Sequence, residues 1–332
     1  MRQAPPGWEM VDTVVRGEGV QVRTVAIACQ GGGSHTAFTG GVLQRLLAEG
    51  DHRVVGLSGT SGGAVCALLA WYGLLTGGAA EAGRLLERFW EANAATTLSG
   101  KLANAWLVGL ARLEGRVTLP TVSPYVYPGF AGTAFTDLLT RHVDVDRLAR
   151  LQESPPADQP LLLIGAVDVL SGDFRAFSSR RGEITVNAVL ASAAVPLLFR
   201  AVEERGRYYW DGLFSQNPPV RELPDAGPEE IWVVRINPRA RATEPKTVGD
   251  IADRRNELAG NLSLEQELYV IRKVNEWADR LGPPYRRIDV REITLDLDLD
   301  LPSKLDRRPA FLRRLFAVGQ ERADAFLAGL PG

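Results

Sequence analysis

The stretch from Val54 to Tyr72, VVGLSGTSGGAVCALLAWY, constrains the fold more than any other part of the sequence. Two β-branched residues lead into a glycine-broken turn, and the apolar segment from Ala64 onward has the character of a buried helix. The turn holds a G-x-S-x-G pentapeptide, with Ser61 between Gly59 and Gly63. This pattern is typical of a strand that turns sharply into a helix and exposes the serine on a strained elbow.

Ordinary glycine-rich loops also produce this pentapeptide by chance, and the chain has 34 glycines. The strand before the turn and the helix after it favour a nucleophilic role for Ser61. The positive end of the helix dipole would then lie where negative charge develops. The neighbouring Ser58 would fall inside the strand, so Ser61 is the predicted nucleophile.

Composition excludes several other classes of protein. Hydrophobic residues make up 45% and charged residues 23% of 332, which is ordinary for a soluble globular protein. A net charge of -2 gives no reason to expect a nucleic-acid partner. Cys29 and Cys66 lie in apolar stretches and the three histidines are scattered, so we expect neither a disulfide framework nor a metal or other cofactor. The first residues have no apolar signal segment, and the expected location is the cytoplasm.

Hydrophobic periodicity predicts a three-layer α/β sandwich, with a mostly parallel central sheet and helices on both faces. Apolar strands alternate with amphipathic helices along the first two thirds of the chain. The strands are expected at 24–29, 53–58, 161–169, 174–178, 207–210 and 231–236, and the helices at 35–49, 64–72, 79–94, 135–142, 145–151 and 184–193.

Residues 95–133 interrupt this alternation with prolines and aromatic residues. We expect irregular structure there, either a lid or lipid-contacting cap or an ordinary packed loop. Together with the arginine pairs Arg307-Arg308 and Arg313-Arg314, this segment motivates the hypothesis of peripheral contact with a membrane. Solvated helix faces explain the arginine pairs equally well.

The density of charge rises after about residue 240. Of residues 241–332, 32 are charged, against 46 of the 240 before them. We therefore divide the chain into an N-terminal arm at 1–20, a hydrolase-like domain at 21–240 and a charged, mainly helical C-terminal extension at 241–332 that packs on the core. Its helices are expected at 248–281, with a break, and at 309–327, around a strand at 288–301 with Asp296, Asp298 and Asp300 on a solvated face.

A serine hydroxyl needs a base to take its proton. The only histidine after Ser61 is His142, and neither it nor the preceding Asp137 is marked as a site residue, so a histidine triad is poorly supported. A buried carboxylate with a raised pKa can serve instead. Asp211 follows an aromatic strand and precedes Gly212, which places it at a strand exit.

Asp168 and Asp173, near a predicted hairpin, are rivals for this role. Asp211 itself could be an ordinary turn aspartate that binds its own backbone. The residues alone leave the choice open.

Gly31, Gly32 and Gly33 follow the first strand and open a helix. Successive glycine amides in such a turn bind anions, so these three are candidates for an oxyanion hole. A phosphate loop is the alternative. No Gly-Lys-Ser/Thr follows, however, and Thr36 stands where a dinucleotide fingerprint needs its last glycine.

These features resemble the patatin-like phospholipases over roughly residues 23–238. The matching pieces are the glycine loop Gly31–His35, the elbow at Ser61, the segment Ala191–Pro196, and a late D-G motif at Asp211. The resemblance implies a carboxylic ester hydrolase that acts on lipids through a Ser61–Asp211 dyad and an acyl-enzyme, with no metal. It also implies that Gly31, Gly32 and Gly33 supply the oxyanion amides.

Two positions depart from the family pattern. His35 replaces the basic residue often found after the glycine loop, and Leu213 replaces the small residue of D-G-[GA]. Both bear on phospholipid preference more than on ester hydrolysis. The alternatives are an esterase for acylglycerol, short-chain or hydroxyalkanoate esters, and a lipid-binding scaffold that has lost its chemistry.

Overall fold

The computed structural model describes residues 22–114, 123–126, 130–196 and 198–331. A mixed eight-stranded sheet runs through its centre in the order β5-β6-β3-β2-β1-β7-β8, with β4 also paired to β3. The strands are β1 (Arg23–Cys29), β2 (His52–Gly59), β3 (Leu161–Asp168), β4 (Phe174–Ser178), β5 (Val202–Glu204), β6 (Arg207–Asp211), β7 (Glu230–Arg235) and β8 (Asp289–Thr294). The helices are α1 (Ala37–Ala48), α2 (Gly62–Asn93), α3 (Leu98–Glu114), α4 (Phe130–Thr140), α5 (Val145–Glu153), α6 (Val186–Ser192), α7 (Val248–Leu281) and α8 (Pro309–Ala328).

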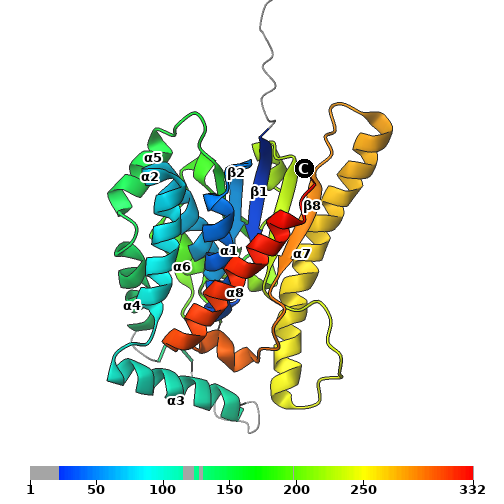
Figure 1. Ribbon diagram of the computed structural model, residues 1–332. Coiled ribbons are helices and arrows are strands. Elements are labelled where there is room, and N and C mark those ends of the chain that lie inside the picture. The colour runs from blue at the N-terminus through cyan, green and yellow to red at the C-terminus, as the bar shows by residue number, and fades with distance from the viewer. Residues whose placement is uncertain (1–21, 115–122, 127–129, 197, 332) are drawn as a thin grey trace, which may run out of the picture.

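The sheet is covered on both faces, as Figure 1 shows for α1, α2 and α8 on one side and α7 on the other. Successive residues of β1 explain the two layers, because side chains of a strand alternate between faces. Val25 and Ile27 join the core with α1, α2 and α8, while Ala26 and Ala28 pack with Leu264 and its neighbours on α7. The predicted α/β class with helices on both faces is confirmed.

The parallel strands β3, β2, β1, β7 and β8 form the main part of the sheet, and β4, β5 and β6 pair antiparallel. The central strand β1 is apolar throughout its last five residues because both faces are buried. The carboxyl ends of parallel strands meet at one edge of the sheet, which is where ligand sites form in open α/β folds.

Helix α2 contains the apolar segment after Ser61. Among the described residues it is the one helix long and apolar enough to span a membrane by length and composition, but 61% of the relevant window is buried within the protein. Its backbone leaves the helical region at Gly77 and Gly78, where it kinks. It therefore combines the two helices expected at 64–72 and 79–94.

Three expectations were wrong. Part of the segment expected to be irregular is helix α3, because its prolines lie after Glu114, whereas residues 115–122 and 127–129 lie outside the described residues. Helix α7 has no break: a capping box of Thr247 and Asp250 starts it, and Gly260 lies within it. Strand β8 ends at Thr294, so the three alternating aspartates lie beyond it, and Asp300 caps the short helix η5 (Leu301–Leu305) instead.

Candidate active site

Ser61 lies on a strained turn between β2 and α2. Its φ of 56° and ψ of −129° are unfavourable for a side chain with a Cβ atom. The flanking glycines make the turn sterically feasible. A Cβ on Gly59 would lie 2.3 Å from the carbonyl oxygen of Gly63, and a Cβ on Gly63 would lie 2.3 Å from that of Cys29. The predicted strand–elbow–helix geometry is therefore present.

The register of β3 brings Asp211 to this elbow. β4 pairs with Leu163 through Val167 along one edge of β3, so β2 and β6 must share the other edge. On that edge Gly59 lies opposite Ile164 and Asp211 lies opposite Ala166. The serine elbow and the end of β6 therefore meet, and the Ser61 side chain interacts with the Asp211 carboxyl group.

Asp211 is only 1% exposed. Burial raises its pKa from 3.8 to about 7, although hydrogen bonds from Ser61 and from the Leu213 amide and the charge of Lys304 act in the opposite direction. The Leu213 amide donates to Asp211 Oδ1 at 2.9 Å. A carboxyl group in this range can accept and return a proton near neutral pH.

Hydrogen bonds to Ser192 hold the backbone of the elbow in place. The Ser61 amide donates to Ser192 Oγ at 3.0 Å and to its carbonyl oxygen at 3.1 Å, while Ser192 Oγ donates to the Gly165 carbonyl. Ser192 belongs to the Ala191–Pro196 segment that the sequence resemblance includes. Its role depends on a contact across 131 positions, which no local pattern indicates.

The glycine loop lies against the nucleophile. The Gly31 amide donates to Asn217 Oδ1 at 2.6 Å, and a Cβ on Gly31 would lie 2.8 Å from the Cβ of Ser61. In this arrangement the Gly31 amide is already occupied. Gly32 precedes the short helix η1 (Gly33–Thr36) and Gly33 begins it, and the amides of both stay the predicted oxyanion donors.

The two departures from the family pattern have physical explanations. His35 is buried and its Nε2 lies 2.7 Å from Ser303 Oγ. Burial, assisted by the charge of Lys304, lowers the pKa of His35 to about 3, so the ring is neutral and supplies no cation. Leu213 points towards α7, where its Cδ1 would lie 3.3 Å from a Cβ on Gly260.

The rival residues have other contacts. Asp168 accepts hydrogen bonds from the amides of Leu170 and Ser171 and pairs with Arg207 at 2.8 Å. The Ser171 hydrogen bond, followed by that of Arg207, lowers the pKa of Asp168, which makes it a weak base. Asp173 is an exposed turn residue of the hairpin.

His142 lines a hollow beside Tyr72. Tyr72 is eleven residues along α2 from Ser61, which at 1.5 Å per residue is a separation of about 16 Å. His142 is therefore far from the elbow.

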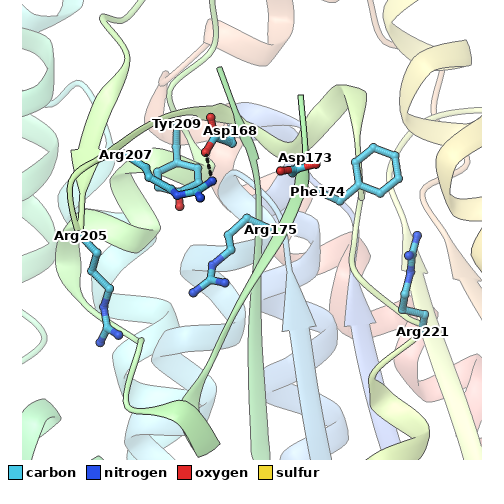
Figure 2. A pocket seen from close by; sticks show the side chains of 8 residues that line it. All are labelled: Asp168, Asp173, Phe174, Arg175, Arg205, Arg207, Tyr209 and Arg221. Atoms are coloured by element: carbon cyan, nitrogen blue, oxygen red, sulfur yellow. Dashed lines mark hydrogen bonds and ion pairs between the residues drawn. The ribbon is translucent and has the colours of Figure 1, made fainter. Parts of the chain in front are cut away.

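A cavity of about 650 Å³ lies between the β3–β4 and β5–β6 hairpins. Figure 2 shows that its four arginines lie around the hollow and do not converge on one point. Each also has a carboxylate partner: Arg175 pairs with Glu183, Arg205 with Glu204, Arg207 with Asp168, and Arg221 with Glu267. These pairs give each arginine a structural role: Arg175, Arg205 and Arg207 belong to the hairpins, whereas Arg221 joins the chain after β6 to α7.

A comparison with known protein families agrees with this fold. The sequence model of the patatin-like phospholipase family matches residues 27–224, more than half of the chain. The chain therefore belongs to the patatin-like phospholipase family, whose members are lipid acyl hydrolases. None of the curated protein sequences matches it.

VipD and ExoU are among the solved structures that are similar to the chain. VipD from Legionella pneumophila is 12% identical with a TM-score of 0.44, and the match covers 93% of this chain and 67% of VipD. ExoU, in the ExoU–SpcU complex of the type III secretion system of Pseudomonas aeruginosa, is 13% identical with a TM-score of 0.32, over 91% of this chain. The match spans 52% of the length of ExoU.

Proposed function

We propose that the protein hydrolyses carboxylic esters of lipids through a Ser61–Asp211 dyad and a covalent acyl-enzyme. The observation that carries this proposal is that Ser61, on its strained elbow, interacts through its side chain with a buried carboxyl group whose pKa is raised to about 7. Membership of the patatin-like phospholipase family supports the substrate class.

In the first half of the reaction, Asp211 accepts the proton of Ser61 Oγ as that oxygen attacks the ester carbonyl carbon. The carbonyl oxygen becomes an oxyanion, which the amides of Gly32 and Gly33 stabilise. The C–O bond to the alcohol then breaks, and Asp211 returns its proton to the leaving alkoxide. The products of this half are the alcohol and an acyl group on Ser61.

In the second half, water attacks the acyl carbonyl carbon while Asp211 accepts a proton from that water. The bond to Ser61 Oγ breaks as Asp211 protonates this oxygen. The fatty acid leaves, and the dyad returns to its initial state. Asp211 thus alternates between its two protonation states, which requires a pKa near the working pH.

A fluorophosphonate probe tests this proposal. The wild type is expected to be labelled with a stoichiometry near one, at the peptide that contains Ser61. Ser61→Ala should remain unlabelled, and Ser58→Ala should label like the wild type. An unlabelled wild type would favour the scaffold alternative, because the probe reacts only with an activated serine.

Acyl release from phosphatidylcholine liposomes and from p-nitrophenyl esters of several chain lengths separates phospholipids from simpler esters as substrates. The neutral, buried His35 is the observation that favours the simpler esters. Peripheral membrane contact stays a prediction, supported by the exposed Leu98 and Leu102 on α3.

Gly31→Ala is expected to lower kcat for ester hydrolysis about 10²-fold, because a shift of the nucleophile by about 1 Å costs that much. The added Cβ would lie 2.6 Å from the Thr60 carbonyl oxygen and 2.8 Å from Ser61 Cβ. Gly50→Ala is the matched control, since nothing lies within 4 Å of its Cβ. An undiminished kcat in a Gly31→Ala protein would show that the close contact does not position Ser61.

A further inference from the structure

A segment far beyond the family-matched region covers the glycine loop. The short helix η5 packs against η1 and against α3. A Cβ on Gly33 would lie 2.4 Å from the carbonyl oxygen of Lys304, so η5 touches the loop directly. Asn104 of α3 holds the same segment, because its Oδ1 accepts from the Arg307 amide at 2.9 Å. Lys304 is therefore held beside the candidate active site.

A chain of hydrogen bonds links the side chain of Lys304 to the glycine loop of the site. Its Nζ donates to Asn237 Oδ1 at 2.9 Å, and Asn237 Nδ2 donates to the Gly31 carbonyl oxygen at 3.3 Å. The Gly31 amide in turn donates to Asn217. Both the amide and the carbonyl group of Gly31 are therefore hydrogen-bonded. The carbonyl group is connected through Asn237 to the ammonium group of Lys304.

The charge of this ammonium group is not used in an ion pair with any described residue. Burial lowers the pKa of Lys304, while Asp253, Glu257 and Asp211 act in the opposite direction and Arg241 assists burial. Asp253 and Glu257 pair with Arg241, and Glu257 also pairs with Arg254 at 3.0 Å. With those two carboxylates engaged by arginines, Asp211 is the remaining carboxyl group among the charges that act on Lys304.

We propose that Lys304 is a positioning residue for the acyl-transfer site, which orients the glycine loop through Asn237 and brings a positive charge from the C-terminal segment to the site. This inference rests on the proposed function. The position after the glycine loop cannot supply that charge, because His35 is buried and neutral. The cation comes instead from the C-terminal segment, and the family-matched residues alone do not complete the site.

The experiment measures kcat/KM for a p-nitrophenyl ester between pH 5.5 and 9 for the wild type, Lys304→Met and Lys304→Gln. Since the positive charge favours the ionised carboxylate, its removal should move the rise of activity to higher pH. We expect a loss of about tenfold at pH 6 and less than about threefold at pH 8.5. Glutamine retains a donor for Asn237, so it separates the charge from the hydrogen bond.

Two further variants serve as controls. Lys304→Arg retains the charge and should leave the position of the rise unchanged, and Lys273→Met removes an exposed lysine that pairs with Glu276 and should behave as wild type. Should Lys304→Met fail to fold, as judged by its melting temperature, Lys304→Gln decides the question. A rise at the wild-type position in folded, uncharged variants would overturn the inference. A wild type without esterase activity or fluorophosphonate labelling would instead contradict the proposed function.

Discussion

Asp211→Asn is expected to lower kcat for ester hydrolysis by about 10³–10⁴-fold while the protein remains folded. A positioned general base contributes about 10²–10⁴ in rate, and here the same group acts in both halves of the reaction. Asparagine retains the shape and can still accept the Leu213 amide hydrogen bond. It cannot take the proton of Ser61, so fluorophosphonate labelling should slow in parallel with hydrolysis.

The wild type should show the matching pH dependence. Only the ionised carboxylate can act as the base, so kcat/KM should rise with pH and reach half of its plateau at about pH 7. Asp173→Asn, on an exposed turn, is the control for loss of a carboxylate outside the dyad. A half-maximal pH near 4, or an Asp211→Asn enzyme with nearly wild-type kcat, would remove Asp211 from the reaction.

The sequence alone indicated those parts of the site that are formed by residues close together in the chain. The pattern that marks the elbow lies within two positions of Ser61, and close contacts require its glycines: Gly59 lies against Gly63, and Gly63 lies against the Cys29 carbonyl oxygen of β1. Asp211 required the family resemblance, because its position depends on the pairing of β6 with β3. Its raised pKa could not be read from the sequence, since it results from burial.

Ser192, Asn217 and Lys304 were missed for a related reason. Ser192 contacts Ser61 from 131 positions away and Asn217 contacts Gly31 from 186 positions away, while Lys304 acts on Asp211 across 93 positions (304 − 211). These hydrogen bonds and charges leave no periodic pattern in the sequence. Asn217 lies five positions after Gly212 and is followed by two prolines, and neither feature of the sequence indicates a contact with the glycine loop. The missed strand β5 is three residues long and has no pattern of its own.

The same burial that prepares Asp211 for catalysis should cost stability at high pH. Its pKa is about 7 in the folded protein and near 3.8 in the unfolded chain, so between these values the folded state binds a proton that the unfolded state has lost. Stability from this group therefore falls as pH rises through that window. A tenfold change in an ionisation constant is worth 1.36 kcal/mol, so the full cost above pH 7 is on the order of 4 kcal/mol.

Asp211→Asn removes this titration, so its stability relative to the wild type should be greater at pH 8.5 than at pH 5 by roughly 2–3 kcal/mol, because about 1.7 kcal/mol of the cost is already present at pH 5. Urea unfolding at the two pH values measures the difference, provided that the m-values agree. Asp173→Asn should change the free energy of unfolding by less than about 0.5 kcal/mol at either pH, as an exposed substitution does. If Asp211→Asn changed the free energy of unfolding equally at both pH values, ionisation of the buried Asp211 would not lower the stability of the folded protein. A gain that is larger at pH 8.5 than at pH 5, together with lost activity, would show that the fold gives up stability to keep a base in its core.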